Sequence, residues 1–318
     1  MQQHPNDGIT NNQTTHARSQ RYTMLRLGFL IVIVTLIVHA IGWHYPVRTG
    51  ACEPTLLVGD NVWVHKLVYK LSTVHRGDLI IFDDPEFDYN TTAWYAPLLG
   101  KGPSIQIKRV IAIPGDMIEG RIEEGRPVIY LNGKKFEEPY INPFPLIRLK
   151  KEVGLIAARR LWHMTIPCSM RKHSKYVLCS YDQTKSFEQQ PFYRMTQDQV
   201  VRHPVTHEPQ LCRAHTPSSA IDFDNASFFY SVDIFGPCRI PEGHYWVMGD
   251  NRQASRDSRY WGLLDGRYIR GRVSCILVSV DSYNRTWLFD ACTHPITFLQ
   301  QQIRWSRFFK YVETYNLK

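Results

Sequence analysis

The sequence predicts a mostly β body that follows a single N-terminal membrane-spanning helix. Residues 27–43, LGFLIVIVTLIVHAIGW, are almost wholly apolar. Between residues 46 and 145, short alternating or apolar runs are separated by turn signals, with no long amphipathic helix among them. The whole chain, at 43% hydrophobic and 21% charged residues, has the composition of a globular protein.

The N-terminal region divides into a tail and an anchor. Residues 1–21 are polar and are expected to form a disordered tail. The anchor is expected over residues 22–45, because a bilayer core needs about 20 apolar residues in a helix and the tyrosine-containing flanks extend the apolar run to that length. A cleaved signal peptide is the alternative. Its apolar region usually has about 7–15 residues and a small-x-small cleavage site follows, whereas this longer run is followed by HYPVRTGA.

Basic residues flank the apolar run unequally. Arg18, Arg21 and Arg26 precede it, and only Arg48 follows closely. Because positive residues stay on the cytoplasmic side, the N-terminus is expected in the cytoplasm and the body outside it. The lipid bilayer is therefore an expected partner. The formal net charge of +9 comes from scattered residues without a nucleic-acid-binding motif, so no nucleic-acid partner is predicted.

The body is divided by its composition. Residues 46–145 are predicted as the first part of a β-rich core, and Asn132-Gly133 within them is the strongest short hairpin signal. Residues 146–235 lack clear periodicity and predict an inserted cap subdomain. Residues 236–318 are predicted as the second part of the core and a C-terminal tail with a short helix.

The cysteines fit an exported body. Six of the seven lie beyond residue 160, and an oxidising compartment would pair them. The short spacing of Cys168 and Cys179 favours that pair first. The positions of Cys212 and Cys238 at the two ends of the latter half of the insertion favour the second pair, Cys275–Cys292 is the remaining pair, and Cys52 is left unpaired.

Lys108 is the residue with the most distinctive chemistry. It lies in an apolar strand pattern with Ile105, Ile107, Val110 and Ile111 around it. A lysine among apolar groups loses hydration, so its pKa falls and the neutral amine becomes a general base. A lysine of this kind can activate a serine hydroxyl without a histidine.

Four segments of the chain follow one another in order: TGACEPTLLVGD, KRVIAIPGD, NGKKFEEPY and GDNRQASRDSRYWG. They resemble, in the same order, the patterns SGSMxPTLxxGD, KRVxGLPGD, NGxxxxEPY and GDNRxxSxDSRxWG. These are the boxes of the signal peptidase I (leader peptidase) family of membrane-anchored serine–lysine proteases. The resemblance implies a β-rich catalytic core with an inserted cap, placed at the bacterial inner membrane, that uses no metal or cofactor.

The same resemblance implies a role for individual residues. Lys108 matches the general base, Ser255 the serine that orients it, and Thr49 a donor to the oxyanion hole. Asp257 and Arg259 match an ion pair that holds the last box, which opens with Asp250, Asn251 and Arg252. The walls of a substrate pocket are expected at Cys52, Pro54 and Ile107.

The nucleophilic serine of the family falls on Ala51. Four interpretations stay open: a serine deliberately replaced by alanine, a natural variant that binds without cutting, a nucleophile moved to Cys52, and a structural part of a secretion or conjugation complex. Cys52 is disfavoured because neighbouring residues of an extended strand point to opposite faces.

The function implied by the resemblance is removal of N-terminal signal peptides from exported preproteins. The alternative is a non-catalytic factor that binds signal peptides or assists assembly of a secretion or conjugation system.

Overall fold

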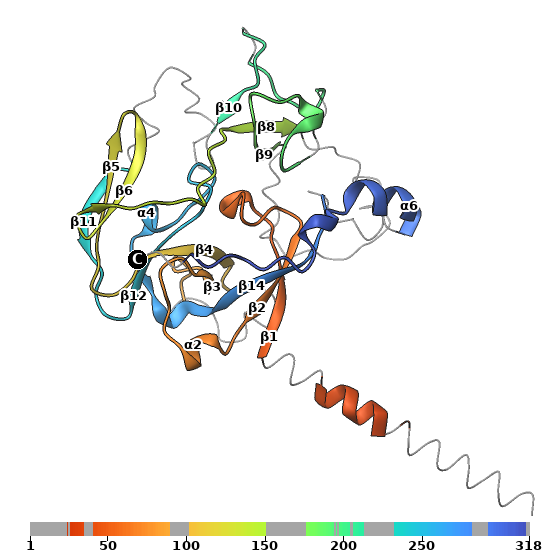
Figure 1. Cartoon of the computed structure of the whole chain (residues 1–318), viewed down its shortest axis with the longest axis horizontal. Helices are drawn as coiled ribbons and strands as arrows, with labels where there is room; N and C mark the ends of the chain where they lie inside the picture. Colours follow the sequence, from red (N-terminus) through yellow and green to blue (C-terminus); the bar gives the residue numbers. More distant parts are fainter. Residues whose placement is uncertain are drawn as a thin grey trace, which may run out of the picture.

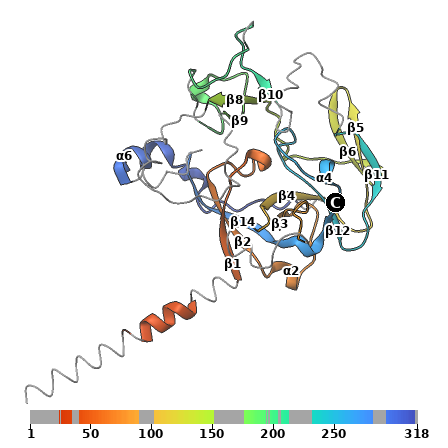
Figure 2. The same ribbon diagram turned by 180° about the vertical axis from the view of Figure 1, so that it is seen from behind.

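The computed structural model describes residues 24, 26–34, 41–89, 102–150, 176–193, 195, 197–203, 206–212, 232–281 and 292–315. These residues form three antiparallel sheets, so the predicted mostly β fold is confirmed. Figures 1 and 2 show the largest sheet at the centre of the body, with a smaller sheet on each of two sides of it.

The central sheet has seven strands in the order β1-β2-β14-β3-β4-β12-β13. Their bounds are Gly42–Pro46, Asp60–His65, Ile269–Ser279, Leu79–Asp83, Ile105–Ala112, His244–Met248 and Leu264–Asp265. All five residues of β3 are buried, because Leu79 and Ile81 pack in one core cluster and Ile80 and Phe82 in another, on the opposite face. The sheet therefore carries a core on both faces.

The second sheet has the order β11-β5-β6-β7. Its strands span Phe235–Arg239, Met117–Glu123, Arg126–Leu131 and Lys134–Lys135. Asn132 and Gly133 link β6 to β7 with φ angles of 52° and 80°. Two successive positive φ angles are those of a type I′ turn, so the predicted hairpin is confirmed.

The third sheet comes from the region expected to form an insertion. It consists of β8 (Leu146–Lys150), β9 (Tyr176–Ser180) and β10 (Leu211–Cys212), in the order β10-β8-β9. Residues of β8 pack with Leu57 and Val58, which belong to the first sequence box. The described part of the insertion is therefore joined to the core by an apolar contact with that box.

Short helical turns connect the strands. They are η1 (Gly50–Cys52), α2 (Val68–Leu71), η4 (Phe187–Gln189), α4 (Ser258–Trp261), η6 (Gly266–Tyr268), α6 (Pro295–Thr297), η7 (Phe298–Gln302) and η8 (Trp305–Arg307). The last three belong to the C-terminal segment, which bridges to β14 between Cys275 and Tyr311 and buries Val312 in the core. The tail therefore packs on the body through more than the single short helix expected from sequence.

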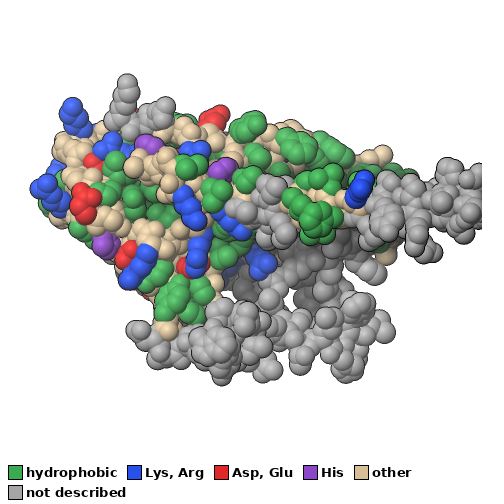
Figure 3. Space-filling view, turned by 90° about the horizontal axis from the view of Figure 1, so that it is seen from below, with side chains coloured by type: hydrophobic (Ala, Val, Ile, Leu, Met, Phe, Trp, Pro, Cys, Tyr) green, Lys and Arg blue, Asp and Glu red, His purple; other side chains and the backbone are tan. Residues whose placement is uncertain are grey.

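The region before the body contains a helical stretch, residues 26–34, whose apolar side chains are exposed (Figure 3). No helix within the described residues is both long and apolar enough to cross a membrane. The predicted anchor ran to residue 45, but residues 42–45 belong to β1 and pair with β2. These residues form a strand and not the end of a helix, because pairing with β2 lets Trp43 and Tyr45 pack against the core.

The cysteine arrangement differs from the predicted pairs. Cys52, as expected, is a free thiol, but Cys238, Cys275 and Cys292 are free thiols as well. The predictions that Cys238 pairs with Cys212 and that Cys275 pairs with Cys292 are therefore wrong. Cys238 lies on β11 opposite β5, whereas Cys212 lies on β10 in a different sheet. Cys168 lies outside the described residues, and so does the predicted pair that involves it.

Candidate active site

The predicted site is built around the turn η1, which carries Ala51. Thr49 precedes the turn in an extended conformation, and the Glu53 amide closes it by donating to the Gly50 carbonyl at 3.3 Å. The Leu56 amide then donates to the Cys52 carbonyl at 2.8 Å. These bonds present residue 51 on a tight, fixed turn.

The loop after β12 lies directly against this turn. The Asn251 amide donates to the Ala51 carbonyl at 3.0 Å. A Cβ at Gly249 would lie 2.3 Å from the Ala51 carbonyl oxygen and 2.4 Å from the Ser255 Oγ. Only glycine fits there, and its missing side chain lets Ser255 approach the backbone of residue 51.

Lys108 enters the site from β4. It is buried, and burial lowers the pKa of its ammonium, against the opposing effects of Cys52 and Asp257. Its electrostatic neighbours include Cys52, from the turn, and Asp257 and Arg259, from the last box. The structure therefore brings Lys108 to the junction of the first and last boxes.

Two buried ion pairs hold the boxes together. Arg109, next to Lys108, donates from Nε and Nη2 to the two oxygens of Asp250 at 2.8 and 2.7 Å. Thr55 Oγ1 also donates to Asp250, at 2.5 Å. Asp250 therefore links the last box to both β4 and the residues that follow the turn.

The second ion pair joins Asp257 and Arg259. Arg259 Nε and Nη2 donate to Asp257 at 2.8 and 2.9 Å, and Nη1 donates to Asp233 at 2.6 Å. Burial raises the pKa of Asp257, but Arg259 outweighs that effect and lowers it to about 2. The carboxylate stays ionised and accepts the Gly249 amide at 3.0 Å, which fixes the loop against the turn.

The remaining predicted residues are placed as follows. Thr49 is exposed and makes no capping hydrogen bond. Arg252 is buried and donates to the carboxylate of Glu138 and to the Gly249 carbonyl. Ser255 Oγ is buried without a hydrogen-bond partner in the described part of the chain. The hydrogen bond expected between Ser255 and Lys108 is therefore not formed in this structure.

The three residues expected to line a substrate pocket differ in exposure. Pro54 and Ile107 are half-buried. Cys52 belongs to a core cluster, and its thiol donates to the Ile107 carbonyl at 3.2 Å. Burial, with a smaller effect of Asp250, raises the pKa of this thiol to about 12. Cys52, the last residue of the turn, is therefore packed into the core and bonded to β4 instead of facing a pocket.

Sequence reasoning missed Glu53. Its carboxylate is buried two residues after Ala51 and accepts hydrogen bonds from the hydroxyls of Ser180 and Tyr193. Both partners come from the predicted insertion, more than 100 residues away along the chain. The available signal was an acidic residue between Cys52 and Pro54, which does not identify its partners.

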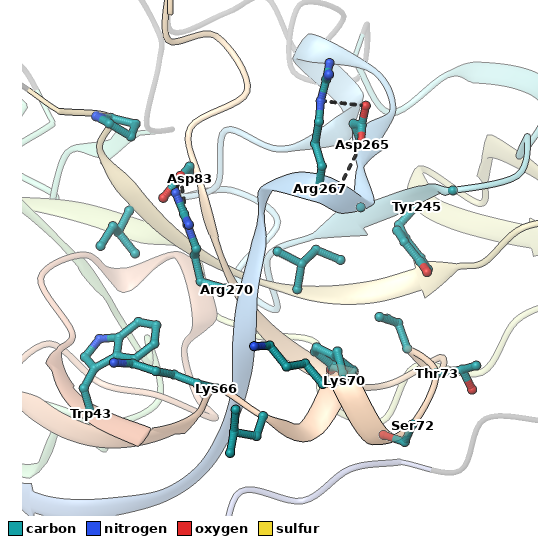
Figure 4. Close-up of a pocket in the computed structure, with 18 of the residues that line it drawn as sticks. Trp43, Lys66, Lys70, Ser72, Thr73, Asp83, Tyr245, Asp265, Arg267 and Arg270 are labelled. Atoms are coloured by element: carbon teal, nitrogen blue, oxygen red, sulfur yellow. Dashed lines mark hydrogen bonds and ion pairs between the residues drawn. The ribbon is translucent and has the colours of Figure 1, made fainter. Parts of the chain in front are cut away.

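A hollow of about 1310 Å³ opens elsewhere, between β1, α2 and the β13–β14 connection. Figure 4 shows Lys66 and Lys70 near Trp43 on one side of it, and Arg267 and Arg270 on the other. Of the twelve residues that the sequence singled out for the site, none lines this hollow.

The comparisons with known proteins decide the family. The family model described as "Signal peptidase, peptidase S26" matches residues 20–278, which include the turn η1, Lys108 and the last box. The chain belongs to this family. Its signal peptidase relatives are serine proteases of signal-peptide processing, and the match ends before the C-terminal segment.

Individual relatives agree with the family. The chain is 30% identical over 262 residues to signal peptidase I of Aquifex aeolicus, covering 79% of this chain and 82% of that protein. It is 22% identical to signal peptidase I of Bacillus licheniformis, over 87% of this chain and all of that protein. A crystal structure of a signal peptidase I from Enterococcus faecalis matches with a TM-score of 0.26 and 19% identity, over 64% of this chain and 98% of that one.

Proposed function

We propose that this signal peptidase family member carries a serine–lysine endopeptidase site in which Ala51 occupies the position of the nucleophile. The observation that supports this most is the buried Lys108 beside the turn that holds residue 51. An amine in an apolar strand costs several kcal/mol unless its proton is given up, so packing alone gives no reason to keep it there.

The mechanism follows from the positions of these groups. A hydroxyl at residue 51 would attack the scissile carbonyl, and its proton would pass to the neutral Nζ of Lys108. Thr49 and the backbone N–H of residue 51 would donate to the developing oxyanion. Collapse of the tetrahedral intermediate breaks the C–N bond, and the proton on Lys108 moves to the leaving amine. Water then hydrolyses the ester.

The substrates in this proposal are exported preproteins. An extended peptide would add to the edge of a strand, so main-chain hydrogen bonds would carry affinity and two shallow pockets would select small residues before the cleaved bond. Pro54 and Ile107, both half-buried, are available as walls. The alanine at position 51 favours the second candidate, a factor that binds signal peptides without cutting them.

Cys52 is a poor substitute for the missing hydroxyl. A thiol attacks as the thiolate, and a buried thiol with a pKa near 12 is almost wholly protonated at neutral pH. Its hydrogen bond to the Ile107 carbonyl also directs the sulfur toward β4. Both facts disfavour a cysteine protease.

The proposed location is the bacterial inner membrane, with the tail in the cytoplasm and the body on the far side. Unequal arginine distribution around residues 27–43 supports this orientation. Protease added to spheroplasts should degrade the body and spare only the tail. A body protected from the protease would contradict the orientation.

The decisive experiment restores the hydroxyl. In Ala51→Ser, a preprotein with a small-x-small site should be cleaved in detergent on the order of 10³-fold faster than with the unchanged protein, because the members of such a site act as a unit. Adding Lys108→Ala to that variant should abolish the cleavage. Gel shift of the preprotein measures both.

Three results would separate the alternatives. No cleavage by correctly folded Ala51→Ser contradicts the catalytic proposal. Tight binding of a signal peptide by that inactive variant then supports the binding factor. Cleavage by the unchanged protein that stops with Cys52→Ser would show that Cys52 is the nucleophile.

A further inference from the structure

Glu53 lies against the back of the turn that carries residue 51. Its side chain is 1% exposed, although its neighbours in the chain are the apolar Cys52 and Pro54. A Cβ at Gly50 would lie 2.5 Å from Glu53 Oε1, so the carboxylate folds back onto the first residue of η1. The carboxylate is therefore packed directly against the turn.

The partners of the carboxylate come from two separate parts of the chain, the insertion and the last box. Ser180, on β9, donates to Oε2, and Tyr193 donates to Oε1. Asn251, from the last box, donates from its side-chain Nδ2 to Oε2 at 3.4 Å, and its backbone N–H donates to the Ala51 carbonyl at 3.0 Å. Glu53 thus joins the insertion, the last box and the turn at one point.

The two hydroxyls that bind Glu53 are themselves held by further hydrogen bonds to other parts of the chain. Asn142 Nδ2 donates to Ser180 Oγ at 2.7 Å, and Tyr193 Oη also accepts the Val58 amide at 3.0 Å. Ser180 is 0% exposed and Tyr193 is 3% exposed. Hydroxyls held at this depth are fixed in position, so they fix the carboxylate as well.

The charge on Glu53 is balanced by few groups. Burial raises its pKa to about 7. The hydroxyls of Ser180 and Tyr193, the side-chain amide of Asn251 and the more distant Arg304 lower this pKa and only partly offset the effect of burial. The carboxyl therefore changes protonation near neutral pH, and each state makes a different hydrogen-bond set with the two hydroxyls.

We propose that Glu53 is a positioning residue, through which the insertion sets the place of residue 51 relative to Lys108. The insertion then contributes to the rate of the reaction as well as covering the core. A displacement of about 1 Å at an attacking atom can lower the rate about 10²-fold, which gives such a contact kinetic weight. The inference rests on the proposed function for its activity measurement only.

The test combines kinetics with amide exchange in the full-length protein. In the Ala51→Ser background, Glu53→Gln and Tyr193→Phe should each lower kcat about 10- to 100-fold and leave KM within about twofold, because the turn and not the peptide edge is displaced. Glu53→Gln should also flatten the pH dependence of kcat around pH 7, whereas Tyr193→Phe, which removes a hydrogen bond that lowers the pKa of Glu53, should shift that dependence to higher pH. The measurements are made well below the Tm of each variant, where a purely stabilising residue would leave kcat unchanged.

Amide exchange provides a readout that needs no activity. The amides of Leu56 and Asn251, which bind the Cys52 and Ala51 carbonyls, should exchange at least about tenfold faster in Glu53→Gln, with or without the serine. Tyr181→Phe is the matched control, because Tyr181 is next to Ser180 in sequence and stacks on Phe187. It should change neither kcat nor exchange.

The outcomes distinguish this proposal from the proposed function. If Ala51→Ser is active but Glu53→Gln and Tyr193→Phe keep its kcat and its exchange rates, the positioning role is overturned. If Ala51→Ser is inactive, the endopeptidase proposal fails, and the exchange rates alone decide whether Glu53 holds the turn.

Discussion

Two groups of arginine–aspartate pairs in this molecule have the same chemistry in opposite surroundings. At the candidate site, the side chains of Arg109 and Asp250 are both 0% exposed, and those of Arg259 and Asp257 are 1% and 0% exposed. In the hollow of Figure 4, Arg267 is 72% exposed, against 30% for its partner Asp265. All of these are ion pairs of an arginine and an aspartate, so it is their burial that distinguishes the pairs that hold the site together from the pair that lies on the surface.

The buried guanidinium groups are also more completely bonded. Beyond Asp250, Arg109 donates to the Gly77 carbonyl at 2.7 Å, and its guanidinium lies 4.3 Å from the centre of the Tyr140 ring. Arg259 adds Asp233 and the Arg252 carbonyl to its bond with Asp257. Such a network tolerates no missing member, because each loss leaves a charge without water or partner.

The largest expected effect therefore follows from Arg259→Ala. It leaves Asp257 and Asp233 buried without their counter-ion and should lower the free energy of unfolding by about 3–5 kcal/mol. Denaturant unfolding of the full-length protein in detergent measures this loss. A loss below about 1 kcal/mol would show that the buried pair behaves like a surface pair.

Acid provides a smaller test of the same pair. The pKa of Asp257 is lowered from 3.8 to about 2, so its stabilising contribution is present above about pH 4 and is lost as the pH falls through about 2. The difference in unfolding free energy between the unchanged protein and Asp257→Asn should shrink by about 2 kcal/mol over that interval. A difference that stays constant with pH would contradict the buried pair.

The exposed pair of Arg267 and Asp265 is the matched control for Arg259→Ala, and its loss is expected to have the smallest effect on the free energy of unfolding. Arg267→Ala should change the free energy of unfolding by less than about 1 kcal/mol, because water and salt already screen the pair. Its expected loss is therefore several times smaller than that of Arg259→Ala. A larger loss would mean that the hollow has a structural role that its exposure does not suggest.

Local signals in the sequence predicted much of the fold. Apolar or alternating runs between residues 46 and 145 marked β2, β3 and β4, and Asn132-Gly133 marked the hairpin between β6 and β7. Lys108 stood out because a charged residue in an apolar strand is unusual, and its burial and lowered pKa agree with that expectation. Each of these signals depends on neighbours within a few residues.

Features that depend on distant partners were missed or wrong. Glu53 gains its role from Ser180 and Tyr193, and the sequence gives no sign that they meet. Arg109 beside Lys108 was not singled out, although it makes the most buried ion pair described in the site. The disulfide predictions used spacing and position along the chain, which cannot show that Cys238 and Cys212 lie in different sheets.

The C-terminal segment has a consequence for how the chain is made. Arg307 Nη2 donates to Asp60, 247 residues earlier, and to the Thr55 carbonyl, so this late segment of the chain holds the second half of the first box in place. Val312 also fills the core beside β2 and β14. Because the chain is made from its N-terminus, the first box is synthesised long before Arg307 and Val312, so the turn cannot gain this support until those residues have been made.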